Sequence, residues 1–186
     1  MGTNEQFQQV MAKCRKVFES KLKDYGASRR ILRPSSVTDQ ILIKAKRIRS
    51  LELTGVSLVG EGIYPEFMGI VNYGIVGLIQ LELGYADTED VTNARAMELY
   101  DLHAQKALDL MLKKNHDYNE AWRSMRVSSY TDFILTKVNR TKQIEGNDGR
   151  TLVSEGIDAN YLDMINYAVF GLIRLDEAEA AQNKAQ

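Results

Sequence analysis

Apolar residues recur along this chain at spacings of three and four, which is the period of an amphipathic helix. The first such segment of each half shows it most clearly. Its apolar positions are Phe7, Val10, Met11, Cys14, Val17 and Phe18 in the first half and Met97, Tyr100, Ala104, Ala107, Leu108 and Met111 in the second. No segment alternates with the period of two that a half-buried strand requires, so we predict an all-α protein.

Two further helices are predicted in each half. The second should open at the tetrapeptides 36–39 and 129–132, which read Ser-Val-Thr-Asp and Ser-Tyr-Thr-Asp. A serine can cap a first turn, and an acid three residues later suits the positive end of the helix. These helices should run to about residues 53 and 145, and third helices should cover about 65–83 and 159–181.

The two halves are copies of one unit. Asp24-Tyr25 recurs as Asp117-Tyr118, and at this offset of 93 the positions 24–47 contain 12 identities in 24. After one inserted residue the offset becomes 94, and positions 58–82 contain 11 identities in 25. We therefore predict a tandem duplication of a three-helix unit, with repeats at 1–86 and 87–186. Because the connection between them is short, they should pack as one pseudo-twofold bundle.

Glycines inside the predicted third helices are shared by both repeats. Gly77 and Gly171 occupy positions where glycine costs about 1 kcal/mol relative to alanine. We interpret them as points where two helices approach closely.

Composition limits the classes of partner. The formal net charge is −1, so direct binding to DNA or RNA is not expected and any phosphate contact must come from a local cluster. The most apolar stretch, 67–83, contains Asn72, Gln80 and Glu82 and is too polar to cross a membrane. A single cysteine, Cys14, favours a reducing cytoplasmic location.

Basic residues form a matched set in the two repeats. Each repeat has two arginines in the loop before the second helix and a Lys-x-x-Arg pair on one face of that helix. The eight residues are Arg30, Arg33, Lys44 and Arg47 in the first repeat and Arg123, Arg126, Lys137 and Arg140 in the second. They are candidates for binding phosphate, and the alternative is internal ion pairing with Asp24, Asp39, Asp117 and Asp132.

The third helices carry polar stripes that differ between the repeats. The first stripe is Glu66, Gly69, Asn72 and Tyr73, and the second is Asn160, Asp163, Asn166 and Tyr167. Because each repeat has an acid where the other has none, a composite site at their junction is predicted. Its expected metal ligands are Glu66, Glu155, Asp158 and Asp163, and hard oxygen ligands of this kind suit Mg²⁺. The alternative is that these acids only cap helices or join the repeats.

Short ordered motifs give the chain a family resemblance. The chain resembles the nucleotide-modification-associated domain family in four segments, which are 114–123 (Lys-Asn-His-Asp-Tyr-Asn-Glu-Ala-Trp-Arg), Lys137-x-x-Arg140, 155–158 and 163–168. Its Asp-x-x-Asn-Tyr helix is also similar to that of the MazG-type all-α nucleoside triphosphate pyrophosphohydrolases. That second resemblance implies a Mg²⁺-dependent hydrolase in which Asp163 is a metal-site acid. The Glu-x-x-Glu motif of those enzymes is missing, since Lys44-x-x-Arg47 and Lys137-x-x-Arg140 stand in its place.

The sequence thus predicts a nucleotide-binding protein, in which hydrolysis of a nucleoside triphosphate or a role in nucleotide modification is the further expectation. Asp163 and Glu155 are the catalytic candidates. The candidates for base or sugar contacts are Asn72, Tyr73, Trp122, Asn166 and Tyr167. The alternative function is a non-catalytic helical interaction module whose charged pairs are structural. Association of two chains into a homodimer stays open.

Overall fold

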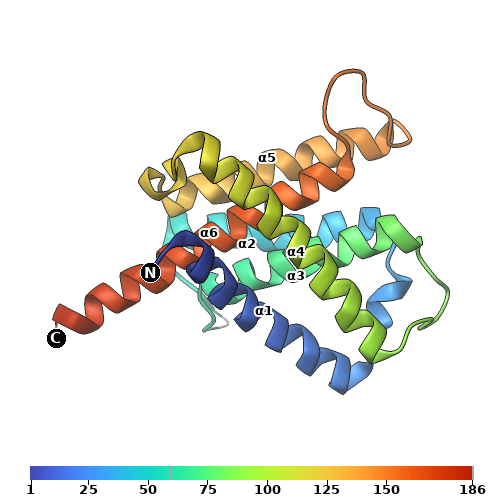
Figure 1. Ribbon diagram of the computed structural model, residues 1–186, viewed down its shortest axis with the longest axis horizontal. Helices are drawn as coiled ribbons and strands as arrows, with labels where there is room; N and C mark the ends of the chain where they lie inside the picture. The colour runs from blue at the N-terminus through green and yellow to red at the C-terminus, as the bar shows by residue number, and fades with distance from the viewer. Residues whose placement is uncertain (59, 186) are drawn as a thin grey trace.

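A computed structural model describes residues 1–58 and 60–185, and within these ranges the chain is helical with no strand (Figure 1). The helices are α1 (Thr3–Tyr25), η1 (Ser28–Ile31), α2 (Pro34–Thr54), α3 (Ile63–Leu83), α4 (Asn93–Tyr118), η2 (Ala121–Ser124), α5 (Val127–Gly146) and α6 (Ile157–Ala185). The all-α prediction is confirmed. No helix in the described part of the chain has the length and apolarity needed to cross a membrane.

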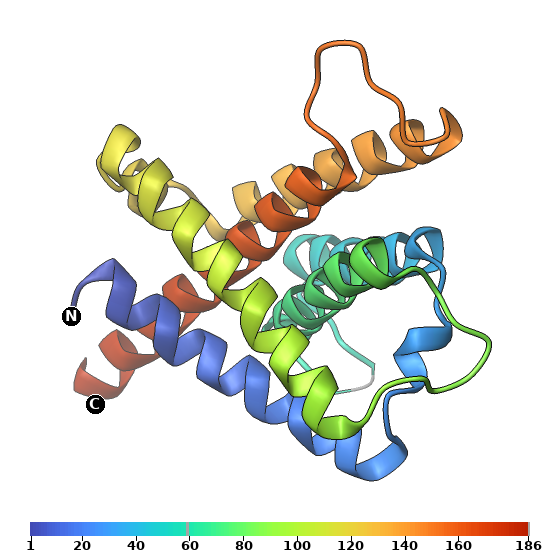
Figure 2. The same cartoon turned by 45° about the vertical axis from the view of Figure 1, so that its right-hand side comes forward.

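The order of helices repeats, as the duplication predicts. Each repeat consists of a long helix, a short 3₁₀ helix and two more long helices. The third helices, α3 and α6, pack against each other in the centre, with α2 on α3 and α5 on α6. Helices α1 and α4 pack against each other on one side of this layer, with the end of α1 beside the start of α4, and the two chain termini lie near each other (Figures 1 and 2).

The second helices begin two residues before the predicted serine caps. Arg33 and Arg126 are the N-caps, with extended backbone and no capping side-chain hydrogen bond. Pro34 occupies the first turn, where its missing N–H would be unpaired in any case. The serine-cap prediction was therefore wrong, because proline at the first helical position sets an earlier start for α2.

Reciprocal hydrogen bonds join the two repeats. The Thr38 hydroxyl donates to Glu145 (2.7 Å), and the Thr131 hydroxyl donates to Glu52 (2.5 Å). Both members of these pairs correspond at the repeat offset, since 131 − 38 = 93 and 145 − 52 = 93. Each repeat thus supplies the same two groups to the other, which is the contact pattern of a twofold axis.

Ion pairs follow the same reciprocal pattern. Asp39 pairs with Lys142 at 2.8 Å, and Asp132 pairs with Arg49 at 2.6 Å. These two aspartates correspond to each other in the repeats, and so do their basic partners. Asp39 and Asp132 therefore join α2 to α5 and do not pair with the cations suspected of binding phosphate.

The paired glutamates predict a pH-dependent stability. Burial raises the pKa of Glu52 and of Glu145 above the ordinary value of 4.5, although the threonine hydrogen bonds oppose the shift. A carboxyl whose pKa is raised by folding stabilises the fold below its unfolded pKa, and that contribution is lost as pH rises through the folded pKa. An E52Q/E145Q variant should therefore melt at a higher temperature than the wild type at pH 7, and this advantage should shrink toward pH 4. Equal pH dependence in thermal melts of the two proteins would contradict this.

The shared glycines lie where α3 and α6 cross. A Cβ at Gly77 would lie 2.8 Å from the ring of Tyr161, and one at Gly171 would lie 3.1 Å from the ring of Phe67. Tyr161 and Phe67 correspond at the offset of 94 and are fully buried. Each glycine therefore accommodates the aromatic ring of the other repeat.

Candidate functional site

The asparagines of the third helices have structural roles. Asn72 donates to the carbonyl of Cys14 at 3.1 Å, and Asn166 donates to the carbonyl of Ala107 at 3.2 Å. Asn72 also accepts a hydrogen bond from the Tyr100 hydroxyl at 2.8 Å, whereas the buried Oδ1 of Asn166 has no partner among the residues described. Asn72, predicted to contact a base or sugar, is therefore fully engaged inside the protein, and Asn166 keeps one acceptor.

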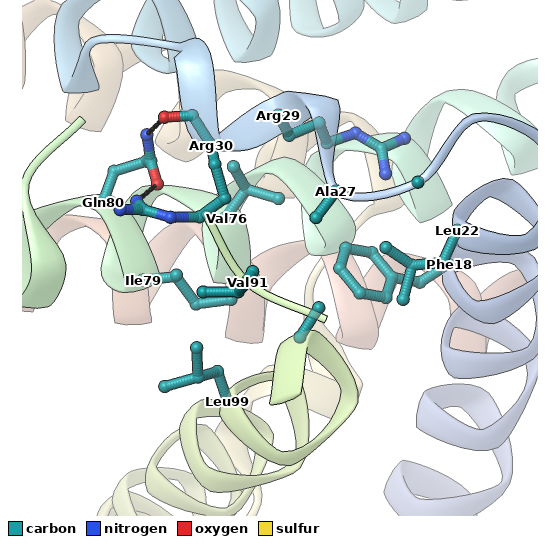
Figure 3. Close-up of a pocket in the computed structure, with 12 residues that line it drawn as sticks. Phe18, Leu22, Ala27, Arg29, Arg30, Val76, Ile79, Gln80, Val91 and Leu99 are labelled. Carbon is teal, nitrogen blue, oxygen red and sulfur yellow. Dashed lines mark hydrogen bonds between the residues drawn. The ribbon is translucent and has the colours of Figure 1, made fainter. Parts of the chain in front are cut away.

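The first loop arginine of each repeat is also held internally. Arg30 is 5% exposed, forms two hydrogen bonds to Asp90 (2.8 and 3.0 Å), and exchanges hydrogen bonds with Gln80 (Figure 3). Arg123 donates to Glu120 at 2.8 Å and to Glu177 at 3.0 Å, and so fixes the end of α6. Neither side chain is available to a ligand, contrary to the phosphate-binding prediction for these two residues.

The second loop arginines lie at exposed helix starts. Arg33 stands 5.8 Å from the ring centre of Tyr85, and Arg126 begins α5. Neither lines a hollow with the lysine and arginine of the second helix of its repeat. The structure does not gather the four cations of a repeat into one cluster.

In the first repeat, the cations of α2 are neutralised by Glu66. Arg47 forms an ion pair with Glu66, and Lys44 lies 3.5 Å from the same carboxylate. Arg47 also donates to the carbonyl of Glu61 at 3.2 Å. Lys44 and Arg47 are therefore both paired with an acid of the same repeat.

The second repeat has a different arrangement, because its acid lies one turn further along the helix. Asp163 is 5% exposed and pairs with Lys114 at 2.6 Å and Lys137 at 2.7 Å. Asn160, which replaces Glu66, donates to the carbonyl of Gly156 instead. Consequently Arg140, the counterpart of Arg47, is exposed and has no carboxylate within ion-pair distance in the described ranges.

Arg140 lines an open hollow, here called the basic cleft, between α5, the start of α6 and the loop 147–156. Its charged lining residues are Lys137, Arg140, Arg150 and Glu155, and its volume is about 810 Å³. The loop stands out from the helices in two views (Figures 1 and 2). Lys137 is paired with Asp163 and Arg150 with Asp148, so Arg140 is the cation of this cleft that has no acid partner among the described residues and can bind an anion.

A second hollow of about 270 Å³, here called the aromatic hollow, lies between α4, η2 and α6 of the same repeat. Its lining includes Tyr118, Trp122, Asn166, Tyr167 and Phe170. The Trp122 ring stacks on Phe170 at 4.4 Å, and the Arg123 guanidinium lies 4.4 Å over the same ring. The faces of Trp122 are thus covered by protein, contrary to the prediction that it stacks a base, and its buried indole N–H has no partner in the described structure.

The ion pair of Asp163 and Lys137 lies between the aromatic hollow and the basic cleft. Asp163 and Lys114 line the hollow, and Lys137, bound to Asp163, lines the cleft. Burial raises the pKa of the Tyr167 phenol, with Asp163 adding to the shift and Lys114 and Arg140 opposing it. Those three charges therefore surround Tyr167 at the boundary between the two hollows.

In the first repeat, side chains fill the space that corresponds to the aromatic hollow. The Arg29 guanidinium, which replaces Trp122, lies 5.4 to 5.6 Å from the ring centres of Phe18, Tyr25 and Tyr73. A cavity remains beside it, between η1 and α4 (Figure 3), but its volume of about 20 Å³ holds about one water molecule. Tyr73, predicted to contact a base, is covered by Arg29 and Lys44.

The four predicted metal ligands are dispersed. Glu66 and Asp163 are held by cations of their own repeats, Glu155 lines the basic cleft, and Asp158 lines another hollow beside His103. No three acidic, histidine or cysteine side chains gather into a metal-binding group within the described residues. The present residues therefore do not fit a metal site held by protein alone, and Mg²⁺ stays a prediction.

Sequence reasoning missed Lys114, Tyr118, Arg150 and Phe170. A signal for Lys114 was present, since Lys21 corresponds to it at the offset of 93. Burial and the nearby Arg29 and Lys44 lower the pKa of Lys21. Burial also opposes the charge on Lys114, but its hydrogen bond to Asp163 raises the pKa above the ordinary value. The opposite pKa shifts of Lys21 and Lys114 thus indicate that the acid, Asp163, lies beside the lysine of the second repeat.

The fold and site define a duplicated all-helical protein whose second repeat carries the basic cleft and the aromatic hollow. The family model for nucleotide modification associated domain 1 matches residues 21–81 and 114–175, one segment in each repeat. The chain belongs to this family, whose description associates it with nucleotide modification. Searches of curated proteins and of solved structures returned no match.

Proposed function

We propose that this protein binds a nucleotide in its second repeat, with the phosphates in the basic cleft. The observation that carries the proposal is the contrast between Arg47 and Arg140. The first is held by Glu66, and the second projects beside an open cleft with Lys137 and Arg150. Arginine binds phosphate through paired hydrogen bonds, and an exposed guanidinium without an acid partner is free to do so.

The interaction-module alternative requires that the charged pairs meet and leave no open space between them. The first repeat fits this description, since its cations meet Glu66 and its inner hollow is filled. The second repeat does not, because the basic cleft and the aromatic hollow adjoin its charged residues. The volume of the basic cleft, about 810 Å³, lies in the range common for small-molecule sites. Nucleotide binding therefore accounts for more of the second repeat than the alternative does.

An Arg140→Ala variant should bind nucleoside triphosphates at least about 10-fold more weakly than the wild type. The reason is that the substitution removes a charged hydrogen bond to the phosphate of every such ligand. Isothermal titration with each common ribonucleotide and deoxyribonucleotide triphosphate measures this. Lys46→Ala is the matched control, because it removes one exposed positive charge from α2, away from the cleft. Equal weakening in both variants would indicate a general charge effect, and an absence of binding to wild type would reject the proposal.

Hydrolysis of the bound nucleotide is a separate part of the proposal. Glu155 is the one acidic residue that lines the basic cleft, and Mg²⁺ is commonly held by one or two carboxylates together with substrate phosphates. Pyrophosphate release, measured with and without Mg²⁺, tests turnover. If turnover occurs, Glu155→Gln should reduce it while leaving the thermal melting temperature unchanged, because Glu155 is exposed. Binding without release would leave a nucleotide-binding protein that does not hydrolyse its ligand.

A further inference from the structure

Two residues that line the aromatic hollow each carry a buried polar atom with no partner among the described residues, one a donor and the other an acceptor. These atoms are the Trp122 indole N–H and the Asn166 Oδ1, on residues that are each 5% exposed. A buried polar atom without a partner costs free energy, and a ligand that pairs with it recovers that cost. A ligand of the hollow is therefore expected to present an acceptor to Trp122 and a donor to Asn166.

Comparison of the repeats explains why Asn166 is unpaired. The hydroxyl of Tyr100, on α4 of the second repeat, donates to the equivalent acceptor of the first repeat, Asn72 Oδ1. The residue that corresponds to Tyr100 is Phe7, since 100 − 7 = 93, and it has no hydroxyl. The two asparagines make the same backbone bond in their repeats, so the missing hydroxyl accounts for the free acceptor.

The first repeat also indicates the shape of the ligand. There a planar guanidinium, that of Arg29, lies against Tyr25 and Tyr73. The corresponding tyrosines, Tyr118 and Tyr167, line the aromatic hollow, and Trp122, the counterpart of Arg29, stacks on Phe170 instead. A flat ring placed there would contact the same aromatic surfaces.

We infer that the aromatic hollow binds the base of the nucleotide, as a planar heterocycle that accepts a hydrogen bond from Trp122 and donates one to Asn166. This inference rests on the proposed function, because it places the phosphates in the adjoining basic cleft. The Asp163–Lys137 ion pair has one member in the lining of each hollow, so the two sites lie side by side. The first repeat, with its hollow filled by Arg29, binds no base, so one chain binds one nucleotide.

Trp122 is the sole tryptophan of the chain, so its fluorescence reports directly on the aromatic hollow. Titrations should compare tripolyphosphate, the nucleosides and the nucleoside triphosphates of the common bases. At least one nucleoside triphosphate should change the Trp122 emission, bind at least 10-fold more tightly than tripolyphosphate, and saturate at one per chain.

Two hydroxyl substitutions give a matched pair of variants. Phe7→Tyr introduces on α1 the counterpart of the Tyr100 hydroxyl, and by the pseudo-twofold relation of the repeats this hydroxyl should donate to Asn166 Oδ1. The preference for nucleotide over tripolyphosphate should then fall about 10-fold, while tripolyphosphate affinity is unchanged. Tyr100→Phe makes the opposite change at Asn72 of the first repeat and should leave the preference as it is. The melting temperature of each variant establishes that it is folded.

The outcomes separate the base pocket from the phosphate site. Nucleotides that bind no more tightly than tripolyphosphate, with constant Trp122 emission, would overturn the base pocket and leave the phosphate site intact. Nucleosides that change the emission as strongly as their triphosphates, with no affinity for tripolyphosphate, would retain the pocket and overturn the phosphate site. If none of the three classes binds, both are overturned.

Discussion

A Gly77→Ala variant should lose about 2 kcal/mol of unfolding free energy, although alanine is normally the better helix former. The added Cβ would lie 2.8 Å from the ring of Tyr161. That ring cannot move aside easily, because it is fully buried and its hydroxyl donates to the carbonyl of Pro34 at 2.9 Å. Chemical denaturation monitored by circular dichroism measures the change.

Other glycines provide a graded control. Gly171→Ala should cost less than Gly77→Ala, because its Cβ would lie 3.1 Å from Phe67. Gly146→Ala, at the end of α5, has no atom within 4 Å of the new Cβ and should be neutral or slightly stabilising. Equal effects at Gly77 and Gly146 would show that the crossing of α3 and α6 does not depend on glycine.

An Asp163→Asn variant should lose about 3 kcal/mol of unfolding free energy, because two lysines would then share no anion. The unpaired charge costs most at Lys137, because its side chain is only 14% exposed. The side chain of Lys114 is 46% exposed and can turn toward solvent. Asp132→Asn is the control. It breaks an exposed pair with Arg49, and exposed pairs contribute less than about 1 kcal/mol.

Added polyphosphate gives Asp163→Asn a second readout. An anion in the basic cleft can take the place of the lost carboxylate beside Lys137, so tripolyphosphate should raise the melting temperature of the variant more than that of the wild type. A variant with wild-type stability and no response to polyphosphate would contradict a structural role for Asp163. Loss of Mg²⁺-dependent turnover at unchanged stability would instead favour the catalytic role that the sequence suggests.

The architecture was predictable because repetition and helical periodicity are properties of the sequence alone. The same offsets that align 24–47 with its copy also align the reciprocal contacts Thr38–Glu145 and Thr131–Glu52. The third helices were predicted from about 65 and 159 and begin at Ile63 and Ile157. The start of α2 was misplaced because serine can cap a helix but also sits well inside the first turn after proline.

The site was only partly predictable, because residue identity does not specify the partner. Arg30 and Arg140 are equally plausible phosphate ligands in the sequence, yet one is buried against Asp90 and the other is exposed beside the basic cleft. The decisive differences between the repeats lie at Phe7 against Tyr100 and at Gly69 against Asp163. Their meaning depends on which side chains face them, and only the packed helices determine that.

The reciprocal contacts between the repeats also bear on the origin of the chain. Each contact occurs twice with its partners exchanged, which is the property of a self-complementary surface in a symmetric homodimer. A single ancestral unit with these residues would have paired with its own copy and carried two identical sites. Joining the genes removed the requirement that both sites remain alike. One half could then fill its hollow with the side chain of Arg29, while the other half kept its hollow open.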